Sequence, residues 1–122
     1  MKLTLDTYDT SLVIQGYQGH SIQIDDKDYG ASLILSPRQL LPDWKPQSID
    51  SLTAEDFQPV LELDPEIILL GTGEKLVFPP TEVLLSVYQK GLGIEIMDTA
   101  AACRTYNILA SENRNVTAAL IV

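Results

Sequence analysis

The chain has 122 residues, the usual size of one domain and enough to bury one hydrophobic core. Apolar residues make up 45% and charged residues 20%, which excludes intrinsic disorder as the main state. The net charge of −9 argues against nucleic acid and anionic membrane surfaces as partners, because both would be repelled. We therefore expect a single domain over residues 1–122.

The acidic residues are concentrated in the first half of the chain. Residues 1–66 carry 12 acids and 4 bases, whereas residues 67–122 carry 5 acids and 4 bases. Two interpretations are open: the acidic half attracts a basic partner, or it only keeps a small protein in solution.

The cysteine content and the first residues indicate the compartment. Cys103 is the only cysteine, so no disulfide forms within the chain, which fits a reducing environment. Residues 1–6 lack the apolar core of a signal peptide, and no apolar run approaches the roughly 20 residues of a membrane helix. We therefore expect a cytoplasmic protein without membrane insertion.

In chain order, the first half has the pattern of β-strands. Alternating or β-branched apolar residues predict strands over residues 11–17, 21–25 and 31–35. Turns are expected at residues 19–20 and 26–28, so these strands form an antiparallel layer. Residues 40–46 are expected to be irregular because two prolines flank them, with Trp44 closing the edge of the core.

The second half alternates between strands and helices. Thr53 is a suitable N-cap for a short helix over residues 54–61. The elements expected after it are a strand at 67–70, a helix at 81–90, a strand at 93–97, a helix from 98–99 to about 113 and a strand at 116–122. Crossovers of this kind imply a mostly parallel sheet, so the fold class is α/β with an additional N-terminal β layer.

A candidate crevice follows from this arrangement, since ligands of open α/β sheets sit beyond the carboxyl ends of the strands. The Gly-Thr-Gly turn at residues 71–73 follows one buried strand, and Asp98 and Thr99 follow the next at a helix N-terminus. A carboxylate or phosphate would be held there by the glycine backbone and by the free N–H groups of the helix start. The Arg104 side chain would add to them, since helix side chains are directed toward the N-terminus and thus toward the glycine turn. Alternatively, Asp98 or Thr99 only caps the helix, the glycines only turn the chain, and Arg104 pairs with a nearby acid.

The remaining reactive side chains are few. Cys103 near a helix N-terminus and beside Arg104 is either an activated thiolate or, as is far more common, a buried inert thiol. His20 is the only histidine, which argues against Cys–His, Ser–His–Asp and zinc chemistry, so we expect no metal or cofactor. Trp44, Phe78 and Tyr106 either pack in the core or form an exposed aromatic anchor for another protein.

Three segments of the chain resemble one family of small domains. They are YGASLILSP at 29–37, LLGTGEKLVFPP at 69–80 and GIEIMDTAAACRTYNILASENRNVTAALI at 93–121. The family contains bacterial and archaeal proteins of unknown function and the mitochondrial assembly factor 3 of NADH:ubiquinone oxidoreductase (complex I). The resemblance implies a three-layer domain with a central mixed sheet. It also implies a family pattern formed by Gly71, Thr72, Gly73, Asp98, Thr99, Cys103, Arg104, Thr105, Tyr106, Asn107 and Arg114.

Two hypotheses about function follow. The resemblance implies a non-catalytic protein-interaction or assembly-factor-like domain, because the mitochondrial members act by binding partner proteins. Its contact surface would be the acidic half or the aromatic edge. The alternative is a small-anion or metabolite-binding domain, or an enzyme, that uses the crevice. The candidate crevice residues are Gly71, Thr72, Gly73, Asp98, Thr99, Cys103, Arg104 and Asn107.

Overall fold

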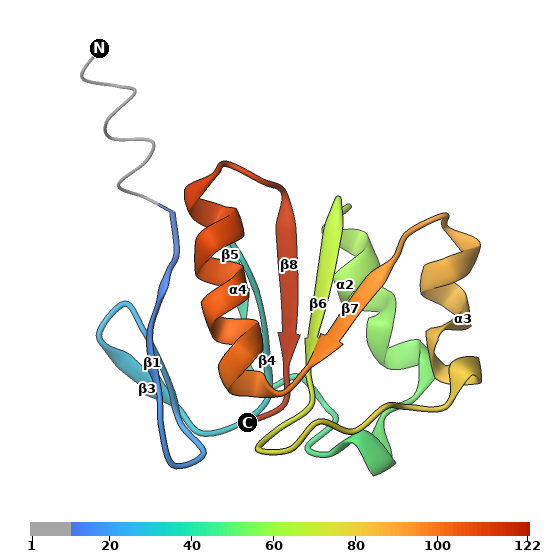
Figure 1. Cartoon of the computed structure of the whole chain (residues 1–122), viewed down its shortest axis with the longest axis horizontal. Coiled ribbons are helices and arrows are strands. Elements are labelled where there is room, and N and C mark those ends of the chain that lie inside the picture. Colours follow the sequence, from blue (N-terminus) through green and yellow to red (C-terminus); the bar gives the residue numbers. More distant parts are fainter. Residues whose placement is uncertain (1–10) are drawn as a thin grey trace.

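A five-stranded mixed sheet lies at the centre of the computed structural model, which describes residues 11–122 (Figure 1). The expectation that residues 1–6 hold no signal peptide, and the first ten residues of the expected domain, lie outside the described part. The strand order is β5-β4-β8-β6-β7. The strands are β4 (Leu33–Ser36), β5 (Gln39–Leu41), β6 (Ile67–Gly71), β7 (Ile94–Met97) and β8 (Val116–Leu120).

The sheet has a parallel and an antiparallel half. β7 and β8 both run parallel to β6, while β4 runs antiparallel to β8 and to β5. The predicted mixed sheet is confirmed, and its parallel part is the part connected by helical crossovers.

The predicted N-terminal antiparallel layer is confirmed as a second sheet. It consists of β1 (Ile14–Tyr17), β2 (Ile22–Ile24) and β3 (Lys27–Tyr29). The turn between β2 and β3 contains only Asp25 and Asp26, which adopt φ values of 54° and 65°. The predicted turn over residues 26–28 is therefore correct only for Asp26, because residues 27 and 28 belong to β3. Two aspartates tolerate the left-handed conformation of a two-residue hairpin turn, so the strand resumes at Lys27.

β5 was also missed by the sequence pattern, which predicts irregular chain from residue 40. Ser36 pairs with Gln39, so Pro37 and Arg38 form a tight turn and β5 continues to Leu41. Proline is compatible with this arrangement because it occupies the turn, and Pro42 follows the last paired residue of an edge strand.

Helical segments fill the connections. They are the 3₁₀ helices η1 (Ile49–Ser51) and η2 (Ala54–Phe57) and the α-helices α2 (Gln58–Glu62), α3 (Thr81–Gln89) and α4 (Thr99–Ser111). The helix predicted over residues 54–61 thus begins with a 3₁₀ turn. α4 stops two residues earlier than predicted, because Asn113 has a left-handed φ of 61° and its N–H donates to the Ala110 carbonyl.

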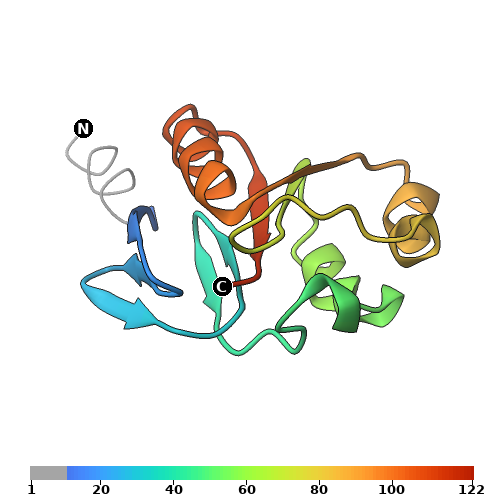
Figure 2. The same ribbon diagram turned by 60° about the horizontal axis from the view of Figure 1, so that its bottom comes forward.

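These elements form three layers, as the resemblance implies. α4 and the β1–β3 sheet cover one face of the central sheet, where Leu35, Leu69 and Ala118 are buried. η2, α2 and α3 cover the other face, over Ile68 and Leu70. Figure 2 shows β1–β3 on one side of the central strands and α2 and α3 on the other. The two cores place the ends of β6 and β7, and therefore the candidate crevice, at one rim of the molecule.

Candidate functional site

The two chain reversals of the candidate crevice lie side by side. Gly71 pairs with Met97 at the end of β6 and β7. The Thr72 N–H donates to the Met97 carbonyl at 3.0 Å, and the Thr99 N–H donates to the Gly73 carbonyl at 2.9 Å. The expected juxtaposition of residues 71–73 with 98–99 is therefore present, at the lower rim in Figure 1.

Thr99 is the centre of this rim, and it is fully buried. Its hydroxyl donates to the Ile121 carbonyl at 2.6 Å and accepts the Gly73 N–H at 2.7 Å. A Cβ atom at Gly71 would lie 2.9 Å from the Thr99 hydroxyl oxygen and 3.1 Å from its Cα. Glycine is thus needed at residue 71 because α4 starts in contact with the strand, which leaves no room for a ligand between them.

Three backbone donors at this rim already make hydrogen bonds inside the protein. The Thr99 and Gly73 N–H groups make the bonds described above, and the Ala101 N–H donates to the Asp98 carboxylate at 2.9 Å. Asp98 is therefore the N-cap of α4, and its negative charge occupies the position where a bound anion would sit.

A shallow depression of about 260 Å³ remains beside Gly73. Asp50, Glu74 and His20 line it, and the His20 Nε2 lies 3.9 Å from a Glu74 carboxylate oxygen with both side chains about two-thirds exposed. Two carboxylates at this position repel phosphate and carboxylate ligands.

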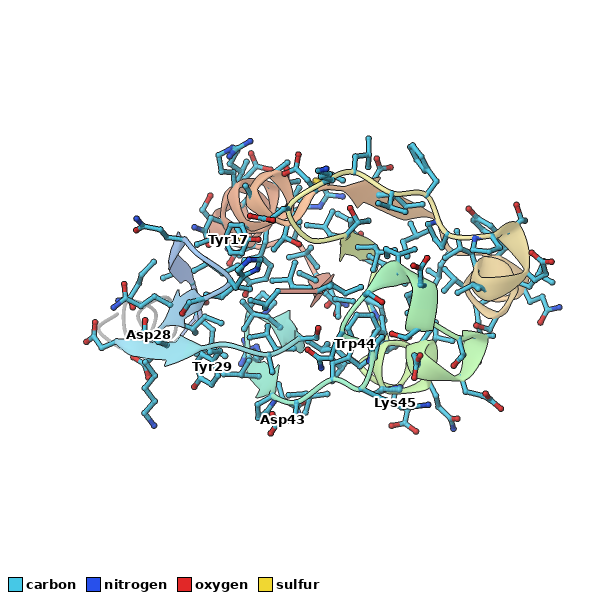
Figure 3. All side chains as sticks on the ribbon, turned by 90° about the horizontal axis from the view of Figure 1, so that it is seen from below. Tyr17, Asp28, Tyr29, Asp43, Trp44 and Lys45 are labelled. Atoms are coloured by element: carbon cyan, nitrogen blue, oxygen red, sulfur yellow. The ribbon has the colours of Figure 1, made fainter. Side chains whose placement is uncertain are left out.

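Tyr17 adds a further polar group near this rim. Its hydroxyl is buried and has no hydrogen-bond partner within residues 11–122. Burial is the largest cause that raises the pKa of Tyr17, and Glu74, Cys103 and Asp98 raise it further. Figure 3 shows Tyr17 beside α4. Of these neighbours, Glu74 and Asp98 are carboxylates, and their negative charge disfavours the binding of an anion at this rim.

Cys103 and Arg104 point in different directions. The Cys103 side chain is buried in the core between α4 and the sheets. Burial raises the pKa of its thiol to about 12, although Arg104 partly opposes the shift. The thiol is therefore protonated at neutral pH and is not a nucleophile there. Arg104 is exposed, and within residues 11–122 it makes no ion pair or hydrogen bond.

Asn107 and Tyr106 fasten β1 to α4. The Asn107 side chain accepts the Ile14 N–H at 2.9 Å and donates to the Ile14 carbonyl at 2.8 Å. The Tyr106 hydroxyl donates to the Leu12 carbonyl at 2.8 Å. Asn107 therefore faces β1 and does not face the Gly-Thr-Gly turn.

The three aromatic candidates have different environments. Trp44 is 5% exposed, its Nε1 donates to the Asp56 carbonyl, and its ring packs edge-on against Phe57 at 6.0 Å. Tyr106 is fully buried, so both residues belong to the core. Phe78 is 68% exposed and is the one that remains available as an anchor.

Phe78 belongs to a feature that sequence reasoning missed, the apolar triplet formed by Leu76, Val77 and Phe78. Their exposed fractions are 52%, 42% and 68%. The segment lies between β6 and α3 and has neither helical nor strand periodicity, so the sequence pattern does not show that all three side chains are exposed. The Thr72 hydroxyl holds the loop, since it donates to the Lys75 carbonyl at 2.6 Å and accepts the Val77 N–H at 3.2 Å.

Two further properties concern residues 11–122. No group of three or more His, Cys, Asp or Glu side chains in this range is arranged to hold a metal ion. None of the helices in this range combines the length and the apolar character needed to cross a bilayer.

The chain is similar to proteins of known sequence and structure. A model of the family described as "Protein of unknown function (DUF498/DUF598)" matches residues 14–121. A Francisella tularensis protein named "13 kDa major membrane protein" is 40% identical over 95 residues, or 77% of each chain. The rat protein named NADH dehydrogenase (ubiquinone) 1 alpha subcomplex assembly factor 3 is 32% identical over 99% of this chain. This chain spans 66% of the rat protein's length. An NMR structure of a Xanthomonas campestris protein has a TM-score of 0.85 and 39% identity, and the match covers 100% of this chain and 92% of that one.

Proposed function

The chain belongs to the family described as "Protein of unknown function (DUF498/DUF598)", and we propose that it binds a partner protein and catalyses no reaction. Its role is that of an assembly factor, which holds a component of a larger complex while that complex forms. The name of the rat relative, which matches nearly the whole of this chain, supports this role. The rat protein is longer, so the partner implied by its name is not transferred to this chain.

The observation that carries the proposal is the apolar triplet. Three adjacent large apolar side chains exposed to water are unfavourable by about 25 cal/mol for each Å² of apolar surface. Such surface is typical of a contact site for another protein, and a single aromatic residue often supplies much of the binding energy there. α3 begins directly after this loop and also exposes Leu85 and Tyr88.

The hydrogen bonds at the rim give the triplet a fixed position. Thr72 holds Lys75 and Val77, and Thr99 holds Gly73 against the end of β8. A loop ordered before binding loses less conformational entropy when the partner arrives. The Gly-Thr-Gly turn and Thr99 therefore serve partner binding as positioning residues, and we place no anion at this rim.

Site-specific photo-crosslinking in the source cell tests the proposal. A photoreactive phenylalanine analogue replaces Phe78 in one variant and Ile108 in a control. Ile108 is an apolar side chain, 58% exposed, on α4. We expect one discrete protein adduct from position 78 and none from position 108. The proposal is contradicted if position 78 yields no adduct, or if both positions yield the same one.

We also propose that the protein resides in the cytoplasm, where Cys103 stays reduced. The cysteine content supports this location, since Cys103 is the single cysteine of the chain and forms no internal disulfide. Cell fractionation tests the location: the protein should be recovered with cytoplasmic markers, and recovery with membranes would refute the proposal.

A further inference from the structure

A cavity of about 320 Å³ lies at the end of the central sheet opposite the Gly-Thr-Gly turn. β4 runs antiparallel to β8, so the turn after β4 and the turn before β8 meet at this end. The Leu12 N–H donates to the Pro37 carbonyl at 2.8 Å and brings Ser11 to the same place. The cavity is lined by the polar residues Ser11, Ser36, Arg38, Gln39, Asn113 and Arg114, among others.

The cavity concentrates positive charge in an acidic protein. The chain has three arginines, and two of them, Arg38 and Arg114, line this space. Within residues 11–122, Arg38 has no carboxylate within 4.0 Å. Arg114 has one, Glu66, at 3.8 Å from its Nε, and the two side chains are 45% and 59% exposed. An exposed ion pair of this length is weak, so the Arg114 guanidinium can exchange Glu66 for another anion.

The C-terminal end of α4, which lies beside the cavity, repels an anion only weakly. Its last carbonyl groups carry partial negative charge, but they accept hydrogen bonds within the turn. The Asn113 N–H donates to Ala110, and the Arg114 N–H donates to Leu109. The side-chain amides of Gln39 and Asn113 make no hydrogen bond within residues 11–122, so their N–H groups are available to a ligand.

We propose that the cavity between Arg38 and Arg114 binds a small oxyanion, the phosphate or carboxylate group of a metabolite. Guanidinium groups bind both chemistries through paired N–H donors, and the two amides supply further donors. The volume matches the lower range of small-molecule sites. This site lies at the opposite end of the sheet from the apolar triplet, and the proposal does not depend on the partner-binding role.

Titration of the ¹⁵N-labelled full chain by NMR tests the proposal. Inorganic phosphate and citrate are added separately, and sodium chloride of matched ionic strength serves as the reference. The variants are Arg38→Gln and Arg114→Gln. The matched control is Arg104→Gln, which removes the same charge from an exposed arginine of α4. The spectrum itself reports whether each variant is folded.

We expect saturable shifts of the Arg38, Gln39 and Asn113 amides with at least one of the two anions. Saturation with phosphate alone identifies a phosphate ligand, and saturation with citrate alone identifies a carboxylate ligand. Either arginine substitution in the cavity should weaken binding at least tenfold, while Arg104→Gln leaves it unchanged. Shifts that merely follow ionic strength, an equal loss in Arg104→Gln, or no shift with either anion would overturn the proposal.

Discussion

At the scale of single residues, Thr99 connects three segments that are distant in the chain. Its hydroxyl joins the start of α4 to Gly73 after β6 and to Ile121 after β8. Because Thr99 is fully buried, water cannot replace either bond when the hydroxyl is removed.

Thr99→Val should therefore destabilise the protein although it preserves the shape of the side chain. An unsatisfied N–H and an unsatisfied carbonyl would remain, which costs about 2–4 kcal/mol in the free energy of unfolding. Urea denaturation measures the change. Thr105→Val, a substitution on the same helix, is the control and should change stability by less than about 0.5 kcal/mol. Equal effects of the two substitutions would refute the role given to Thr99.

The burial of Cys103 leads to a second prediction, about the reactivity of its thiol. The pKa of its thiol is raised to about 12 in the folded protein, mainly by burial. The unfolded chain therefore loses this proton first as the pH rises, so the contribution to stability is complete below about pH 8.5 and declines above it. Iodoacetamide at pH 8 should react slowly with the native protein and rapidly in urea. Equal rates in the two conditions would show a reactive native thiolate.

The sequence allowed some of these residue roles to be predicted and concealed others. Asp98 as an N-cap follows from its place before an apolar helix pattern, and the capping role was one of the two interpretations weighed. Thr99 and Asn107 are both among the candidate crevice residues, Thr99 because it follows a strand at a helix N-terminus and Asn107 as part of the family pattern that the resemblance implies. Their actual partners are backbone groups at residues 121 and 14, and a contact between such distant positions leaves no local pattern.

At the scale of elements, α4 holds the β1–β3 sheet in place. The sheet has only short strands and packs against a helix, as such small sheets require for stability, and its Ile14 backbone is bonded to Asn107. Asn107 thus connects the small sheet to the helix that covers the central one.

Asn107→Leu should loosen β1–β3 selectively. The substitution removes both bonds to Ile14 and costs about 1–2 kcal/mol, because the pair is only partly buried. Amide hydrogen exchange should accelerate in β1 and β2, while β6 and β8 keep their protection. Ile108→Ala, an adjacent exposed position, serves as the control. Uniform acceleration in all strands would contradict a local role.

The elements themselves were predicted wherever the apolar pattern was long. The buried strands β6 and β8 and the helix α4 follow from continuous apolar runs and from helical spacing. β3 and β5 were missed because each is a three-residue edge strand beside a turn. Such strands depend on their neighbour for pairing, and a single-strand pattern does not contain that information.

At the scale of the whole molecule, the two ends of the central sheet have different characters. The end with the Gly-Thr-Gly turn carries Asp50, Glu74 and the apolar triplet, and the opposite end carries Arg38 and Arg114. The rule that ligands bind beyond the carboxyl ends of parallel strands directed attention to the first end. That end is packed with internal hydrogen bonds, whereas the open polar cavity lies at the other end, which includes an antiparallel pair.

The central claim is that the apolar triplet of residues 76–78 binds a partner protein. The most direct test is the dissociation constant of the crosslinked partner for Phe78→Ser, with Ile108→Ser as the matched control. The account predicts that Phe78→Ser weakens binding at least tenfold without lowering stability in urea, and that Ile108→Ser binds like the parent. Binding by Phe78→Ser within twofold of the parent, or an equal loss in Ile108→Ser, would contradict it.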